Sequence, residues 1–241
     1  MAIAPDGSYV VVGYFSDVID FDPSHAQDLH TARGIYDAFI TKFNADDSYA
    51  WTRTLGGAAH DLVQHVAVAT DGAVMASGYY SGTVDLDPGP GVRMHTSGGS
   101  SEAFLLKLGS DGSFGWVDTF VVSGDPQEAG GEGGPVAVGP DGSVYTAGFF
   151  RGNVDVDPGT AVDLRTSLNG DSDAYVVKLS AAGTLIWGKT IACPQSENAN
   201  NLKVAPAGIL WLGGASPARA TLIPGLALTL SHPKDWTTAS F

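Results

Sequence analysis

The residues most capable of chemistry in this chain are aspartates that recur in an Asp-x-Asp-Pro motif. The motif occurs three times, at Asp20–Pro23, Asp85–Pro88 and Asp155–Pro158. If the motif is extended, its two carboxylates lie on one face, about 7 Å apart. A third acid of each repeat follows 15 to 18 residues later and could join them. The nine acids are Asp20, Asp22, Asp37, Asp85, Asp87, Glu102, Asp155, Asp157 and Asp173.

Two or three carboxylates with nearby carbonyl oxygens suit a hard cation such as Ca²⁺, which takes six to eight oxygen ligands. Two other interpretations stay open. The acids could cap turns by accepting hydrogen bonds from backbone N–H groups. They could also pair with Lys42, Lys107 and Lys178, which recur at one strand position. The full spacing of an EF-hand loop is absent, so the motif is a weak signal for a metal. Ca²⁺ is the only cofactor that the sequence suggests.

The remaining candidates for chemistry are sparse. His30 and His95 occupy equivalent places, and Arg165 takes that place in the third repeat, which favours a solvated strand face. Cys193 is the only cysteine, so no intrachain disulfide can form. Gly130–Gly134 reads as a flexible loop and not as a phosphate cradle. Neither a G-x-S-x-G elbow nor a phosphate-binding loop is present, so no catalytic residue is predicted.

The elements that position these residues come from an internal repeat. Trp51, Trp116 and Trp187 are 65 and 71 residues apart, and the three lysines and three Asp-Pro motifs keep nearly the same spacing. A fixed period of this kind is typical of repeat architectures. The chain therefore contains about three and a half repeats, with approximate limits 1–63, 64–133, 134–200 and 201–241.

Each repeat reads as four strands separated by turns. In repeat 2 the expected strands are Val66–Ala69, Ala73–Tyr80, Ala103–Leu108 and Phe114–Val121, with Asp-Gly turns after the first and third. In repeat 3 the later strands are expected at 143–150, 174–179 and 185–191. The tryptophan at the start of each fourth strand indicates core between repeats, or alternatively a platform for sugar rings. Four antiparallel strands per unit predict an all-β propeller with four-stranded blades.

The segments Gly78–Gly89 and Glu102–Leu108 resemble bacterial SBBP-type β-propeller repeats. The shared pattern is roughly G-x-F-x-G-x-V-D-F-D-P-G, followed by D-A-F-V-x-K-L, an Asp-Gly turn and a tryptophan. The resemblance covers nearly the whole chain in three copies. It implies a β-propeller within large secreted or surface proteins of environmental bacteria, and it does not imply one activity.

Repeat 4 departs from this pattern. Thr221 and Ile223 stand where repeat 3 has Asp155 and Asp157, and Ala239–Phe241 stands where it has Asp173–Tyr175. We therefore expect the last blade to be degenerate and incomplete. Three arrangements stay open: a distorted four-bladed ring, half of a larger propeller that dimerises through open blade edges, or a fragment of a longer chain.

Composition narrows the function. The 241 residues carry a formal net charge of −14, which disfavours nucleic acid as a partner. No apolar run reaches the length of a membrane span, and the first residues do not read as a signal peptide. We expect a non-enzymatic binding or display module, extracellular or on the cell surface, with a protein or glycan ligand. The alternatives are a hydrolase or lyase with a central-channel site, and an assembly element.

Overall fold

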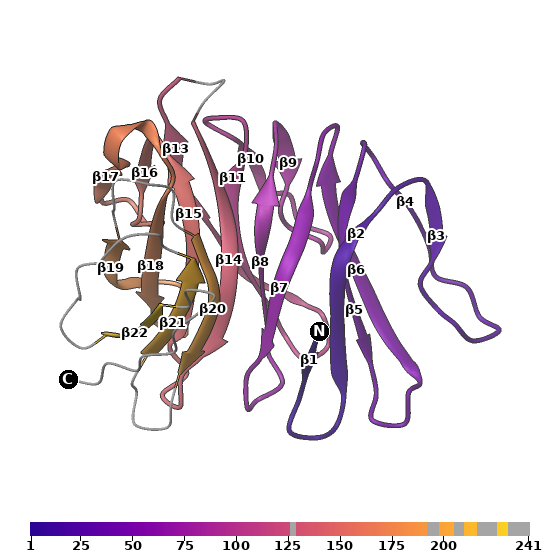
Figure 1. Ribbon diagram of the computed structural model, residues 1–241. Coiled ribbons are helices and arrows are strands. Elements are labelled where there is room, and N and C mark those ends of the chain that lie inside the picture. The colour runs from indigo at the N-terminus through magenta and orange to yellow at the C-terminus, as the bar shows by residue number, and fades with distance from the viewer. Residues whose placement is uncertain (126–128, 192–197, 205–209, 216–225, 231–241) are drawn as a thin grey trace.

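The computed structural model describes residues 1–125, 129–191, 198–204, 210–215 and 226–230 (Figure 1). The chain is all-β and its sheets are mainly antiparallel, as the repeat pattern predicts. The described part contains one turn of 3₁₀ helix, η1 (Leu168–Gly170). In that part of the chain, no helix has the length and apolar character needed to cross a membrane.

Three repeats build the same four-stranded meander. In each, the strands lie in chain order and neighbours pair antiparallel. Repeat 1 contains β1 (Ala2–Ile3), β2 (Tyr9–Phe15), β5 (Asp37–Phe43) and β6 (Tyr49–Gly57). Repeat 2 contains β7 (Leu62–Val68), β8 (Val74–Tyr80), β11 (Glu102–Leu108) and β12 (Phe114–Phe120). Repeat 3 contains β14 (Gly130–Val138), β15 (Val144–Arg151), β18 (Asp173–Leu179) and β19 (Leu185–Ile191). The expected strands are confirmed to within a few residues.

The turns between the first and second strands follow from the Asp-Gly sequence. In repeat 2, Oδ1 of Asp71 accepts a hydrogen bond from the backbone N–H of Ala73 at 3.0 Å. Gly72 has a φ of +82°, a conformation that glycine adopts without steric cost. The side chain and the glycine together fix the reversal of the chain that pairs β7 with β8.

A short hairpin is inserted between the second and third strand of each repeat, where the sequence showed only a polar stretch. The hairpins are β3 (Val18–Asp20) with β4 (Leu29–Thr31), β9 (Thr83–Asp85) with β10 (Met94–Thr96), and β16 (Asn153–Asp155) with β17 (Leu164–Thr166). β9 also pairs with the end of β6 in the preceding repeat. β16 pairs in the same way with β13 (Val122–Ser123), which follows β12. The hairpins of repeats 2 and 3 therefore join neighbouring repeats, whereas β3 and β4 form a separate two-stranded sheet.

The glycine-rich segment Gly130–Gly134 is not a loop, contrary to the expectation from its sequence, because it forms the start of β14. β14 packs against β7 and β8 of the preceding repeat. A Cβ atom on Gly133 would lie 2.5 Å from the carbonyl oxygen of Gly78. The glycines are thus needed for close approach of two backbones, a use that composition does not distinguish from flexibility.

The fourth unit begins like the others and then differs. β20 (Asn198–Val204) pairs antiparallel with β21 (Leu210–Ala215), and β20 packs against β14, β15 and β18. β22 (Leu226–Leu230) pairs parallel with β21, whereas the third strand of each earlier repeat is antiparallel to the second. The substituted positions Thr221, Ile223 and Ala239–Phe241 lie outside the described residues.

The core lies between adjacent sheets. Phe104, Leu106 and Leu108 pack with residues of repeat 1 such as Ile40, whereas the alternate residue Leu105 packs with repeat 3. Both faces of β11 are therefore buried, which explains why it is apolar at nearly every position. A third cluster joins repeat 3 to β20, and the sheets stand side by side in Figure 1.

Candidate functional site

The repeated tryptophan and lysine join repeat 1 to repeat 2 and repeat 2 to repeat 3. Trp51 and Lys42 are cross-strand neighbours on β6 and β5. Trp51 Nε1 and Lys42 Nζ both donate to the backbone carbonyl of Ser110 in repeat 2, at 3.2 and 3.1 Å. The indole ring also lies against Gly112, where an added Cβ would come within 2.9 Å of it. We call this arrangement the turn lock.

The second turn lock has the same geometry. Trp116 Nε1 and Lys107 Nζ donate to the carbonyl of Ala181 in repeat 3, at 3.2 and 3.0 Å, and the ring lies against Gly183. The expectation that these tryptophans form core between repeats is confirmed for Trp51 and Trp116. None of the three lysines forms an ion pair with one of the nine predicted acids in the described part of the chain; Lys178 instead contacts Asp141 at 3.4 Å.

The Asp-x-Asp-Pro acids accept hydrogen bonds from the backbone. Oδ1 of Asp85 accepts from the N–H groups of Asp87 and Arg93, at 3.1 and 2.8 Å. Oδ1 of Asp87 accepts from Gly89 at 2.8 Å. The same bonds are made by Asp20, Asp22, Asp155 and Asp157. These six acids therefore close the inserted hairpins, which agrees with the turn-capping interpretation.

The third acid of each repeat is buried and holds the loop before its strand. Asp37 accepts from the N–H groups of Arg33 and Gly34, and its pKa is raised by burial. Glu102 accepts from Gly98 and from the hydroxyl of Tyr80, and Asp173 accepts from Leu168. Each third acid is thus separated in role from the two acids that precede it. In the described residues, no three or more His, Cys, Asp or Glu side chains are grouped so that they could hold a metal ion.

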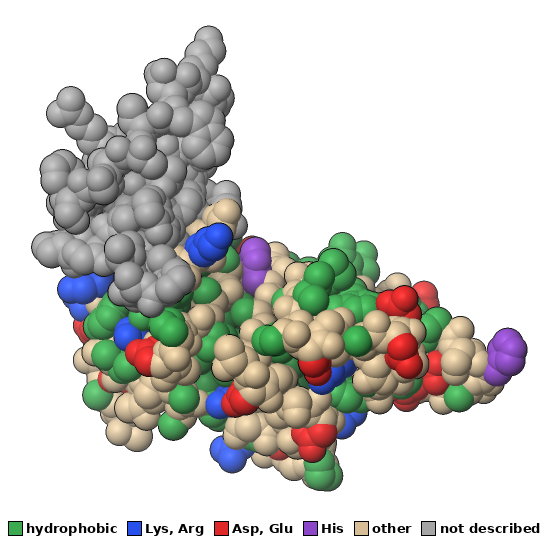
Figure 2. Space-filling view, turned by 90° about the horizontal axis from the view of Figure 1, so that it is seen from below, with side chains coloured by type: hydrophobic (Ala, Val, Ile, Leu, Met, Phe, Trp, Pro, Cys, Tyr) green, Lys and Arg blue, Asp and Glu red, His purple; other side chains and the backbone are tan. Residues whose placement is uncertain are grey.

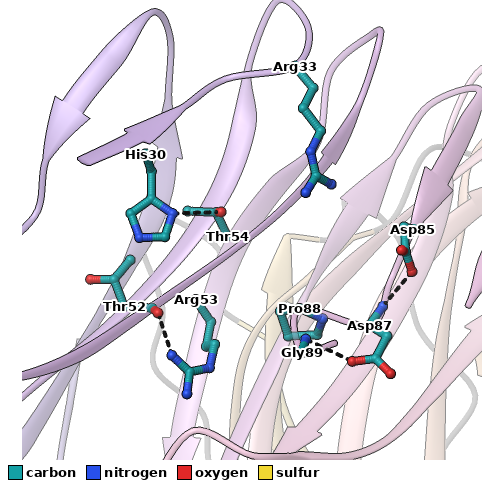
Figure 3. A pocket seen from close by; sticks show the side chains of 9 residues that line it. All are labelled: His30, Arg33, Thr52, Arg53, Thr54, Asp85, Asp87, Pro88 and Gly89. Atoms are coloured by element: carbon teal, nitrogen blue, oxygen red, sulfur yellow. Dashed lines mark hydrogen bonds between the residues drawn. The ribbon is translucent and has the colours of Figure 1, made fainter. Parts of the chain in front are cut away.

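A polar pocket of about 300 Å³ lies at the junction of repeats 1 and 2 (Figure 3). Its walls come from β4 and the loop after it, from β6, and from the end of β9 with the loop that follows. The lining residues are His30, Arg33, Thr52, Arg53, Thr54, Asp85, Asp87, Pro88 and Gly89. We call this pocket the junction pocket. It brings together two of the predicted acids and several residues that the sequence did not single out.

His30 is held on both sides of its ring. Nε2 lies 3.2 Å from Oδ2 of Asp28, and Nδ1 lies 3.0 Å from Oγ1 of Thr54 (Figure 3 shows the second contact). In the neutral ring with its proton on Nε2, that N–H donates to the carboxylate and Nδ1 accepts from the threonine hydroxyl; in the protonated ring both nitrogens donate. Tyr49 donates its hydroxyl to the same carboxylate, and burial together with this bond raises the pKa of Tyr49 to about 12. His30 was expected on a solvated strand face; it is instead half-buried, because the hairpin places it against Thr54 of β6.

Two arginines give the pocket fixed positive charge. Arg33 donates to the carbonyl of Gly56 at 3.3 Å. Arg53 donates to the carbonyls of Gly112 and Thr52, each at 2.8 Å, and stacks over the ring of Trp51. Arginine and aspartate face the same cavity, so it offers both hydrogen-bond donors and acceptors at set positions. Such a lining suits a small polar ligand that carries several hydroxyl groups.

The corresponding position at the next junction has the opposite charge. Asp118 occupies in repeat 2 the place of Arg53 in repeat 1. Burial, together with the nearby Asp157, raises the pKa of Asp118 to about 7. Among the described residues, its Oδ2 atom has no hydrogen-bond partner. The two junctions therefore share a backbone arrangement and differ in the chemistry of one side chain.

The combination at His30 does not repeat. Arg93 and Asp163 stand at the place of Asp28, and His95 and Arg165 stand at that of His30. The only signal in the sequence was the Asp-x-His spacing, which puts both side chains on one face of a strand. Thr54 lies 24 residues away, and only the strand register reveals it.

The surface charge does not mark a separate site. Figure 2 shows acidic side chains spread over several parts of the described surface, with basic side chains beside them. No protein-family model matches this chain, and no match is found among curated protein sequences. The geometry of the junction pocket is therefore the basis for a functional proposal.

Proposed function

We propose that this chain is a β-propeller-type repeat module that binds a hydroxyl-rich ligand of the sugar class in the junction pocket and does no chemistry on it. The module would belong to a secreted or surface protein of a bacterium, as the resemblance to SBBP-type repeats implies. The single observation that carries the proposal is the polar lining of the pocket, in which arginine, histidine and aspartate side chains are held in place.

The repeated side chains support this choice by being occupied elsewhere. Trp51 and Trp116 are packed in the turn locks, so they are poor candidates for an exposed sugar platform. The propeller part of the proposal is supported by three equal meanders with apolar cores between them. In such an arrangement, ligand specificity is carried by loops and junctions that differ between repeats.

The test is binding to a glycan array, followed by calorimetry on any hit. Arg33→Ala should lower the affinity at least tenfold, because it removes a hydrogen-bond donor from the pocket. The side chain that is lost makes one hydrogen bond to the backbone, at the carbonyl of Gly56. His95→Ala is the matched control, since its histidine occupies the place of His30 in repeat 2 and does not line the pocket. Absence of any glycan hit, or equal loss in both variants, would contradict the proposal.

We further propose that Ca²⁺ stabilises the fold through the Asp-x-Asp-Pro loops. The oxygens of Asp85 and Asp87 that accept no N–H bond would be its ligands, together with nearby carbonyls. A ligand that binds only the folded state raises the unfolding midpoint. A thermal melt in millimolar Ca²⁺ should therefore exceed one in chelator, and Asp85→Asn should reduce the difference. Equal midpoints for the wild-type chain would rule the cation out.

A second candidate, a hydrolase, is favoured by the contacts among Asp28, His30 and Thr54. A carboxylate, an imidazole and a hydroxyl in this order could activate the hydroxyl as a nucleophile, with the imidazole taking its proton. The candidate differs from a central-channel enzyme, because His30 and Thr54 line the junction pocket and Asp28 contacts His30. Hydrolysis of a nitrophenyl ester that is lost in Thr54→Val and kept in Thr119→Val would replace the binding proposal.

A further inference from the structure

The inserted hairpins of repeats 2 and 3 each use one strand edge to join the preceding repeat. β9 pairs antiparallel with Gly56 and Gly57 at the end of β6, and β16 pairs antiparallel with β13. The N–H group of Asp155 in β16 also donates to the carbonyl of Val121 at 2.9 Å. At both of these junctions, this edge of the hairpin therefore takes an antiparallel partner strand.

The equivalent edge in repeat 1 has no such partner. β3 pairs with β4 alone, in a two-stranded sheet, among the strands that the structure describes. Ile19 occupies in β3 the place of Val84 in β9 and of Val154 in β16. Ile19 is 37% exposed, whereas both valines are 0% exposed. Val18 is exposed as well, so this free strand edge presents apolar side chains to solvent.

The sheet face beside this edge is also incompletely covered. In repeat 2, Phe104 and Leu108 pack on repeat 1 and are fully buried. Phe39 and Phe43 take their places in β5 and are only partly buried. Alternation along the strand turns these two rings away from repeat 2, because Ile40 between them packs with repeat 2. We call this aromatic side of repeat 1 the front face.

The front face lies at the end of the array away from the fourth unit. Figure 1 places β3 and β4 at one end and β20, β21 and β22 at the other, and β20 packs against β14, β15 and β18. Every segment outside the described residues follows β13 in the chain. The opposite faces of repeats 1, 2 and 3 are each covered by the unit that follows. The surface that a second copy of the chain can offer is therefore its own front face.

We infer that the front face and the free edge of β3 form a two-fold interface between two copies of this chain. Period-two alternation from the equivalent Asp155 assigns the outward N–H and C=O groups of β3 to Val18 and Asp20. With Ile19 at the two-fold axis, Val18 of each copy lies opposite Asp20 of the other, and these residues exchange backbone hydrogen bonds. The two Ile19 side chains meet on one face. The strand is thus complementary to itself, as a two-fold interface requires.

Sedimentation equilibrium over the micromolar range tests the interface, in about 0.15 M salt to screen the repulsion between two chains of net charge −14. The wild-type average mass should rise with concentration and level off at two chains. Ile19→Lys should raise the dissociation constant about tenfold or more, because it places two like charges opposite each other. Met94→Lys is the matched control and should dimerise as the wild type does. It adds the same charge at an exposed position of β10, in a hairpin whose edge is already paired.

A cysteine at the two-fold axis gives a second measurement that leaves the interface intact. In a Cys193→Ser background, Ile19→Cys should form a disulfide-linked dimer with oxidised glutathione. Opposed residues of a non-hydrogen-bonded antiparallel pair have Cα atoms about 4.5 Å apart, which a disulfide can bridge. Met94→Cys in the same background should give no linked dimer.

Three results would overturn the proposal. One is a wild-type chain that stays monomeric at the highest concentration. Another is a dimer that persists unchanged in an Ile19→Lys chain whose melt shows that it is folded. The third is a mass that grows beyond two chains, because the front face would then join a different surface of the next copy. If Ile19→Lys does not fold, the cysteine variants decide, and absence of the linked dimer contradicts the proposal.

Discussion

Two junctions can be compared, one between repeats 1 and 2 and one between repeats 2 and 3. They share their backbone arrangement and differ in their polar side chains. Both have a turn lock, a bridging hairpin and an apolar core. In the first, Arg53 donates to carbonyls beside a polar pocket. In the second, Asp118 lies close to Asp157 and its pKa is raised to about 7.

The difference separates what holds the array together from what makes each junction distinct. The locks use backbone carbonyls as acceptors, so they tolerate any side chain at the acceptor residue, such as Ser110 or Ala181. Arg53 also donates to the turn of the first lock, at the carbonyl of Gly112, whereas the Oδ2 atom of Asp118 has no hydrogen-bond partner among the described residues. A repeat array can therefore vary the chemistry of one junction while the neighbouring junctions stay unchanged.

The largest effect should come from removing a lock. Trp51→Ala should lower the free energy of unfolding by about 3–4 kcal/mol, because a buried ring and its hydrogen bond are lost. Trp116→Ala should cost less, about 2 kcal/mol, since Trp116 is only half-buried. Denaturant unfolding measures both. Trp187→Ala is the control, and a loss as large as that of Trp51→Ala would show that the ring matters for its own sheet and not for the junction.

A smaller effect should distinguish the junctions by pH. The folded-state pKa of Asp118 lies above its ordinary value of 3.8, so the chain is stabilised by the bound proton below about pH 4 and loses that stability as the pH rises towards 7. Asp118→Asn removes the titration and should raise the free energy of unfolding by about 2 kcal/mol at about pH 8. The same variant should gain little at about pH 4. An equal gain in the free energy of unfolding at pH 4 and at pH 8 would mean that ionisation of Asp118 does not cause the effect.

The smallest effect concerns the aromatic core of each junction. Tyr175 takes in repeat 3 the place of Phe104 in repeat 2, and its buried hydroxyl has no hydrogen-bond partner in the described part of the structure. Tyr175→Phe should raise the free energy of unfolding by about 1 kcal/mol, because an unsatisfied buried hydroxyl is removed. Tyr80→Phe should lower it, since that hydroxyl donates to Glu102. Chemical denaturation of the two variants measures both changes. A lower free energy of unfolding for Tyr175→Phe would show that the hydroxyl of Tyr175 has a hydrogen-bond partner.

The strands of the three repeats could be predicted because they are apolar runs of strand length that recur between recognisable turns. The inserted hairpins could not, because β9 and β10 are three residues each and rich in polar side chains. The capping role of Asp85 was one of the alternatives, and the structure places its N–H partners at 3.1 and 2.8 Å. Whether it also binds Ca²⁺ stays a prediction.

The junction pocket could not be predicted from the sequence, because its residues are brought together only by the tertiary fold. His30 reaches Thr54 only because β4 lies over β6, and Asp85 reaches the same cavity only because β9 pairs with the end of β6. Both facts depend on tertiary register. The partners of the repeated lysines could not be read from the sequence for the same reason. Lys42 was a candidate partner of the nearby acids, but it donates to the carbonyl of Ser110, which lies 68 residues away.

The pairing of β9 with β6 has a mechanical consequence. Because β9 of repeat 2 pairs with the end of β6 in repeat 1, unfolding either repeat also breaks backbone hydrogen bonds of the other. Force applied along the chain should therefore be resisted by pairs of repeats acting as one unit. The hairpin β3–β4 forms a separate two-stranded sheet and pairs with no other strand in the described part of the chain. Under tension this hairpin should therefore unfold first. It should lengthen the chain before force reaches the sheets that are paired across repeats.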